Sequence, residues 1–202
     1  MDHKRRNFIQ TTIAASLGIP LIGPNLISDS LLKDQKIKIS LQCYSFASSL
    51  FNKKMNIIDF PKIVREDFNI EAAEYWNRPM VEKRRDSNFI REFNKRTNDY
   101  GLKNTFMLVD LINFQTGESK SLCSRDKIER NIAIEEHKEW IEFSKAIGCK
   151  GIRVNLWSDN MTSSEVKSIS QDSLGELLEF SNKINMSIVI ENHGGIHLMP
   201  NG

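Results

Sequence analysis

Ser187-Ile188-Val189-Ile190-Glu191-Asn192-His193-Gly194-Gly195 is the stretch of this chain that decides the fold. A short, β-branched apolar run ends abruptly in a carboxylate, an imidazole and two glycines. Such a run is typical of a buried parallel strand. In α/β proteins the ligand chemistry lies at the carboxyl ends of the strands. Glu191 and His193 are therefore the first candidates for a functional site.

Four further apolar runs precede this one, and they recur at a regular spacing. The five predicted strands span 37–42, 70–76, 104–109, 151–157 and 187–191. Apolar residues recur at helical spacing in each gap between them, over 57–68, 89–100, 128–147 and 174–184. Strands that alternate with helices in this way predict a parallel sheet.

The polarity of the strand faces favours a barrel over an open sheet. In the fourth run Ile152 and Val154 share one face, whereas Arg153, Asn155 and Trp157 share the other. An open doubly wound sheet, the alternative, is covered by helices on both faces and should be apolar on both. It should also carry a glycine-rich GxGxxG turn after its first strand when it binds a dinucleotide, and none occurs there.

A (β/α)8 barrel, often called a TIM barrel, needs eight strand–helix units and roughly 250 residues. Residues 29–202 hold five such units. We therefore expect an incomplete α/β (β/α)8 TIM barrel, the N-terminal part of a longer protein. Because five strands alone leave two unpaired parallel edges, we also expect this piece to be poorly stable by itself.

Composition and charge exclude some classes of protein. Hydrophobic residues make up 40% of the 202 residues and charged residues 27%, which is ordinary for a soluble globular chain. The net charge is +2, and Lys4, Arg5 and Arg6 against Asp2 account for all of it. The body is thus neutral, which argues against nucleic acid as a partner. Three cysteines without CxxC spacing predict small buried residues and no disulfide framework.

Residues 1–28 have the pattern of a targeting segment. A basic region is followed by an apolar stretch over 11–23, and the arginine pair resembles a bacterial twin-arginine signal. This predicts export to the periplasm, with the signal cleaved or retained as an anchor. The alternative is a disordered basic tail before a short helix. A membrane span is not expected, because glycine and proline interrupt the stretch at Gly18, Pro20, Gly23 and Pro24.

Four motifs together resemble a known family. They are Ser40-Leu41-Gln42-Cys43-Tyr44-Ser45-Phe46, Asp59-Phe60-Pro61-Lys62-Ile63-Val64 followed by Glu71-Ala72-Ala73-Glu74-Tyr75-Trp76, Ala146-Ile147-Gly148-Cys149-Lys150-Gly151-Ile152-Arg153-Val154-Asn155, and Ile190-Glu191-Asn192-His193-Gly194-Gly195. Over about residues 37–195 the chain resembles the xylose isomerase-like barrel superfamily, in its sugar phosphate isomerase/epimerase branch.

The resemblance implies a metal-dependent reaction on a small-molecule sugar. Members bind a divalent cation (Mn²⁺, Mg²⁺, Zn²⁺ or Co²⁺) through a Glu on strand five, which matches Glu191. An Asp, a His and a Glu on strands six to eight complete the set and have no counterpart before Gly202; His197 does not match. The family reaction removes a proton beside a carbonyl through an enediolate, so Glu191 is implied both as metal ligand and as catalytic base.

Other polar residues at the strand ends are candidates for substrate binding, each with a structural alternative. We predict that His193, Arg153, Asn155, Trp157 and Glu74 bind substrate. His193 could instead donate to a backbone carbonyl, and Arg153 could form a salt bridge with Glu74. Trp157 and Trp76 could stack on a sugar or pack the rim. For Asp110 we expect loop capping rather than a place in the polar lining.

Three alternative functions remain open from the residues. They are a non-catalytic carbohydrate-binding barrel, a sugar lyase or dehydratase with the same enolate chemistry, and an abasic-site endonuclease of the same superfamily. The neutral body and the export signal disfavour the endonuclease. The sequence does not specify which sugar is bound, whether it is phosphorylated, or the oligomeric state.

Overall fold

A computed structural model describes residues 38–112, 116–156 and 161–191. From Ile39 on, these residues belong to one compact unit. The predicted signal and the candidate residues Trp157 and His193 lie outside the described residues.

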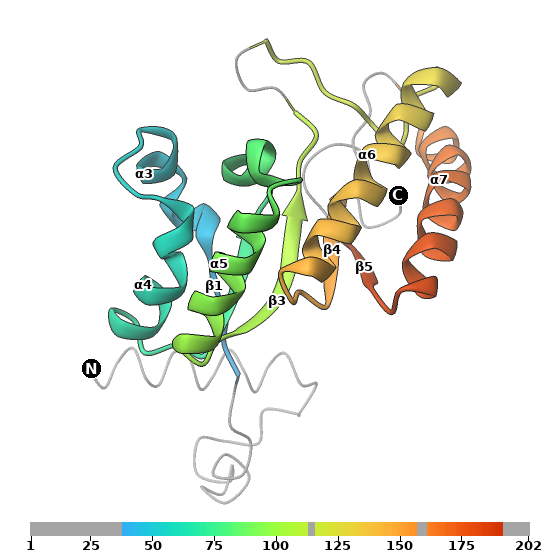
Figure 1. Cartoon of the computed structure of the whole chain (residues 1–202). Coiled ribbons are helices and arrows are strands. Elements are labelled where there is room, and N and C mark those ends of the chain that lie inside the picture. Colours follow the sequence, from blue (N-terminus) through green and yellow to red (C-terminus); the bar gives the residue numbers. More distant parts are fainter. Residues whose placement is uncertain (1–37, 113–115, 157–160, 192–202) are drawn as a thin grey trace, which may run out of the picture. The chain divides into compact units, whose positions relative to one another are not determined.

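Five parallel strands form one sheet in the order in which they occur along the chain (Figure 1). They are β1 (Leu41–Gln42), β2 (Ala72–Trp76), β3 (Lys103–Val109), β4 (Gly151–Asn155) and β5 (Ser187–Glu191). Because crossovers between parallel strands are right-handed, strands in chain order place all connecting helices on one face. A doubly wound sheet would reverse its strand order instead. The five predicted strands and the barrel-type arrangement are confirmed, with β1, β2 and β4 shorter than predicted.

Helices follow the strands in the predicted alternation. They are α4 (Phe60–Glu66), α5 (Ser87–Asp99), α6 (Lys127–Ala146) and α7 (Ser163–Lys183), and Figure 1 shows them one after another along the sheet. Three short segments were not predicted: η1 (Cys43–Phe46), α3 (Ala47–Phe51) and η3 (Arg78–Lys83), while η2 (Ile57–Asp59) leads into α4. They are too short to show a hydrophobic period.

Side-chain caps fix where the long helices begin. The Asp86 carboxylate accepts from the backbone of Asn88 and Phe89 at the start of α5, and Asp126 does the same for α6. Thr162 and Glu165 form a reciprocal capping box on α7. Gly148, with a φ of +82°, ends the α6 segment in the left-handed conformation that glycine adopts without strain.

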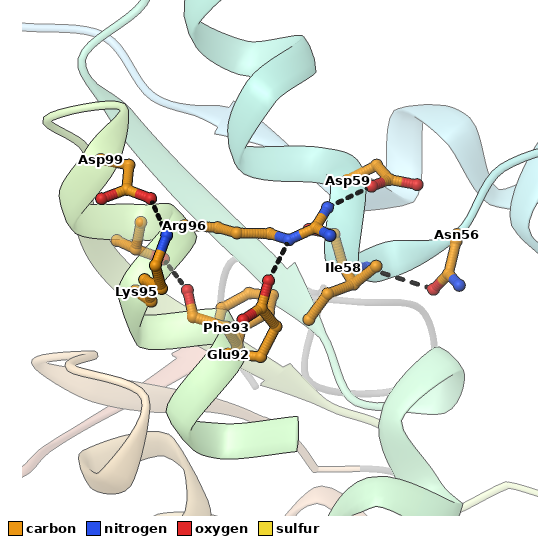
Figure 2. Close-up of polar contacts among 9 residues, drawn as sticks. Asn56, Ile58, Asp59, Glu92, Phe93, Lys95, Arg96 and Asp99 are labelled. Atoms are coloured by element: carbon orange, nitrogen blue, oxygen red, sulfur yellow. Dashed lines mark hydrogen bonds and ion pairs between the residues drawn. The ribbon is translucent and has the colours of Figure 1, made fainter. Parts of the chain in front are cut away.

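Arg96 holds α5 against the segment before α4 (Figure 2). Its guanidinium pairs with Asp59 of η2, and its Nε donates to Glu92 Oε1 at 2.8 Å within α5. Lys95 and Asp99 form a further pair at 2.7 Å along the same helix. Because these groups are largely exposed, they fix the orientation of the helix more than they stabilise the fold.

The hydrophobic core lies between the sheet and the helices. Tyr75, Met107 and Ile152 are fully buried on the helix-covered face of the strands. Close packing reaches the backbone at Gly151, where an added Cβ would lie 2.3 Å from the Ser187 carbonyl oxygen. Glycine at this position therefore lets β4 and β5 approach each other.

The three cysteines are free and buried, as expected. Burial raises the pKa of Cys43 to about 12 and that of Cys123 to about 11, so neither thiol is a nucleophile near neutral pH. Within the described residues, β1 and β5 pair with one neighbour each, and Val189 and Ile190 of β5 are exposed. None of the described helices is long and apolar enough to cross a membrane.

Candidate functional site

Polar side chains gather where the strands end, on the face of the sheet opposite the helices. Strand pairing aligns Gln42 with Glu74 and Asn155 with Glu191. We call the interacting residues Trp76, Asp110, Arg153, Asn155 and Glu191 the strand-end cluster. Trp76, Arg153, Asn155 and Glu191 belong to β2, β4 and β5, and Asp110 directly follows β3.

A register shift between β2 and β3 brings Asp110 into this cluster. Ala73 pairs with Asn104, but Tyr75 pairs with Met107, so β3 contains one extra residue. Asn104 faces the helices, where it donates to the Ile147 carbonyl at 2.5 Å. Simple alternation from Asn104 would place Asp110 on that same side. The extra residue reverses the alternation and turns Asp110 to the opposite face.

Asp110 is the common acceptor of the cluster. Its Oδ1 accepts from Arg153 Nη1 at 2.6 Å and from Asn155 Nδ2 at 2.8 Å, and its Oδ2 accepts from Trp76 Nε1 at 2.7 Å. The backbone of Asp110 is also fixed, because the buried amide side chain of Asn77 bonds to both its N–H and its carbonyl. The loop-capping expectation for Asp110 was wrong: its carboxylate joins β2 to β4 as part of the polar lining.

Arg153 bridges two carboxylates. Its Nε lies 2.8 Å from Glu191 Oε2, while Nη1 bonds to Asp110. The Nε contact is an ion pair whose geometry does not form a hydrogen bond. The Arg153 side chain is 10% exposed and that of Glu191 44%. A buried guanidinium requires such partners, because an uncompensated buried charge costs several kcal/mol.

Arg153 thus forms a salt bridge, but its partners are Asp110 and Glu191 and not Glu74, the partner expected from the sequence. Glu74 instead accepts from Ser40 Oγ, directly before β1, through its Oε1 at 2.6 Å. Gln42 Nε2 lies 3.5 Å from the other oxygen. Glu74 is on the predicted polar face, but it does not contact the strand-end cluster through any of these bonds.

Aromatic side chains border the cluster on the β1 side. Trp76 is fully buried, so it packs the rim and does not present an open face to a sugar. Tyr44 and Phe51 meet it edge-on, with ring centroids 4.9 and 5.2 Å away. These two rings are about half exposed. Tyr44 lies in one of the four motifs that resemble the family, whereas Phe51 lies in none of them.

The described residues alone do not fit a metal centre. In the ranges 38–112, 116–156 and 161–191, no group of three or more His, Cys, Asp or Glu side chains is placed to hold a metal ion. Glu191 supplies one carboxylate, whereas zinc, calcium and magnesium sites in proteins use about four to eight ligands.

Comparison with known proteins gives matches in structure and none in sequence. No protein-family model matches the chain, and no curated protein matches it. A crystal structure of D-psicose 3-epimerase in the presence of D-fructose superimposes with a TM-score of 0.61 at 13% identity, over 76% of this chain and 52% of that one.

Two further structures have the same fold. The IolI protein with a bound zinc atom gives a TM-score of 0.59 at 16% identity, over 76% of this chain and 51% of that one. An AP endonuclease of family 2 from Brucella melitensis gives 0.53 at 6% identity, over 68% and 50%. The chain spans about half the length of these structures. The described residues therefore have the fold of part of a (β/α)8 TIM barrel, as these structures do.

Proposed function

We propose that this chain is part of a sugar isomerase or epimerase that acts on a keto-sugar, and that the strand-end cluster lines its substrate site. The observation that carries the proposal is the convergence of Asp110, Arg153, Asn155 and Glu191 at the carboxyl ends of adjacent strands. This is the edge at which TIM barrels hold their active sites. The likeness in fold to D-psicose 3-epimerase supports a sugar as substrate.

Glu191 is our candidate for the catalytic base. Arg153 engages its Oε2, so Oε1 is the oxygen that would take a proton from the carbon beside the substrate carbonyl. Return of that proton to the neighbouring carbon, with a proton passing from one substrate oxygen to the other, isomerises the sugar. Epimerisation requires a second acid, from outside the described residues, that delivers a proton to the opposite face of the same carbon. Asn155 would bind a substrate hydroxyl. His193 and Trp157, which lie outside the described residues, are also proposed to bind substrate.

We also propose dependence on a divalent cation (Mn²⁺, Mg²⁺, Zn²⁺ or Co²⁺), with Glu191 as one ligand and the others from outside the described residues. The zinc atom in the structure of IolI supports this proposal. When bound, such a cation would stabilise negative charge on substrate oxygens.

Solvent-proton exchange tests the proposed function. D-Fructose and D-psicose are incubated with the protein and added Mn²⁺ in deuterium oxide, and NMR follows loss of the proton beside the carbonyl. We expect exchange with the wild type and its loss in Glu191→Gln. Glu179→Gln, a surface carboxylate paired with Lys183, should leave the rate unchanged. Equal exchange in all three proteins would refute a role for Glu191.

A non-catalytic carbohydrate-binding barrel is the second candidate. The ion pair between Arg153 and Glu191 favours it, because the pair occupies one oxygen of the predicted base and ligand. Sugar binding without proton exchange would select this candidate over the enzyme. The abasic-site endonuclease is less favoured, because the acidic residues of the cluster would repel DNA phosphates.

We further propose that residues 1–28 direct export to the periplasm by the twin-arginine route, on the evidence of Arg5 and Arg6. Cell fractionation tests this: a variant with both arginines replaced by lysine should remain in the cytoplasm. Export of the variant at the wild-type level would contradict the proposal.

A further inference from the structure

We infer that Asp110 makes this site select an uncharged sugar over the phosphate ester of that sugar. The inference rests on the proposed function, because it concerns the substrate class of the same site. It does not depend on which sugar is bound or on whether a metal is present.

The charge at the strand ends is the first observation. The strand ends considered are the last three residues of each strand, or all of β1, with the next residue where the structure describes it, as it does for β1 to β4. In this set, Arg153 is the only basic side chain and Glu74, Asp110 and Glu191 are acidic. The described strand ends thus carry a net negative charge, which opposes the approach of a phosphate.

The second observation is that Arg153 is already paired with two carboxylates. A guanidinium at the end of a strand would ordinarily be a good phosphate ligand, because its planar donors match phosphate oxygens. Here Nη1 bonds to Asp110, and Nε lies against Glu191. Two carboxylates therefore oppose one cation, and the side chain is almost completely buried between them.

The third observation is a buried acceptor without a partner. Asn155 Oδ1 is inaccessible to solvent and accepts no hydrogen bond from any described residue, because the amide is held through Nδ2 by Asp110. A sugar hydroxyl can donate to this oxygen once the side chains that cover it move. The doubly ionised phosphate group of an ester has no proton to donate, so in the same place it would leave the oxygen unsatisfied.

Asp110 controls all three features. It neutralises Arg153, it orients Asn155 with its oxygen free to accept, and it adds a negative charge at the strand ends. Replacement by asparagine removes that charge while it keeps nearly the same shape. The Arg153 donors then become more available to an anion.

Calorimetric titration with D-fructose and D-fructose 6-phosphate tests the inference. The proteins are the wild type, Asp110→Asn, and Asp172→Asn as a control that removes an exposed carboxylate from α7. We expect the wild type and the control to bind the neutral sugar more tightly. In Asp110→Asn the ratio of the two affinities should move about tenfold toward the ester, from the Coulomb energy of one charge near a phosphate.

Arg153→Gln provides a second variant in case Asp110→Asn does not fold. Loss of the only cation at the described strand ends should move the ratio further toward the neutral sugar. Tighter binding of the ester by the wild type, or a ratio that Asp110→Asn changes no more than the control does, would overturn the inference alone. Binding of neither compound by the wild type would overturn the proposed function, and the inference with it.

Discussion

Replacement of Asp110 by alanine gives the sharpest test of the strand-end cluster as a structural unit. The change removes one oxygen that accepts from Arg153 and Asn155 and a second that accepts from Trp76. Removing one partner of a buried ion pair costs about 3–5 kcal/mol. We expect the free energy of unfolding to fall by about 4 kcal/mol, near the middle of this range. The loss should not be larger, because Glu191 stays beside Arg153 and water can reach the donors that Asp110 no longer satisfies.

Urea unfolding at neutral pH, followed by tryptophan fluorescence, measures this loss. The double variant Asp110→Ala/Arg153→Met removes the unpaired cation and should be about 2 kcal/mol more stable than the single variant. Asp99→Ala, which breaks an exposed pair with Lys95, should cost less than about 1 kcal/mol. A loss below about 1 kcal/mol in Asp110→Ala would refute the reasoning.

Three further predictions follow from the packing, the buried histidine and the caps. Gly151→Ala should prevent stable pairing of β4 with β5, because its Cβ would lie 2.3 Å from the Ser187 carbonyl oxygen; loss of the cooperative melting transition checks this, and an unchanged melting temperature would contradict it. His137 is buried in α6, and burial lowers its pKa from 6.5 to about 4, so the unfolded chain binds a proton that the folded chain does not. Stability should therefore fall by about 3 kcal/mol as the pH drops from 6.5 toward 4, and the fall should be smaller in His137→Gln; parallel pH profiles of the two proteins would count against this. Thr162→Ala should cost about 1 kcal/mol in urea unfolding by removing the capping box of α7, whereas Thr162→Ser should retain most of it.

The strands and long helices could be predicted from the sequence because their signals are local. The five apolar runs and the helical periods between them correspond to β1–β5 and to α4, α5, α6 and α7. The order of the strands follows from the barrel, which the polar face of the strands favoured, because neighbouring strands of a (β/α)8 barrel follow one another along the chain. The short segments η1, α3 and η3 have no such period, so only the structure shows them.

The partners in the candidate site could not be predicted, because they depend on strand register. Asp110 reaches the polar face through one extra residue in β3, which the sequence does not reveal. The sequence suggested Glu74 on β2 as a salt-bridge partner for Arg153 on β4. These two strands are not neighbours in the sheet, and the usual strand spacing separates them by roughly 9–10 Å. Its actual partners, Asp110 and Glu191, come from the adjacent strands β3 and β5.

NMR titration of the ¹⁵N-labelled protein with D-fructose is the most direct test of the central claim, that the strand-end cluster lines a sugar site. The indole N–H of Trp76 and the side-chain amide of Asn155 both bond to Asp110, so both should report binding. We predict saturable shifts of these two signals, with little change in the side-chain amide of Asn94 on α5, which bonds to the Ala146 carbonyl. Saturable shifts confined to the helices, or no shifts at all, would contradict the claim.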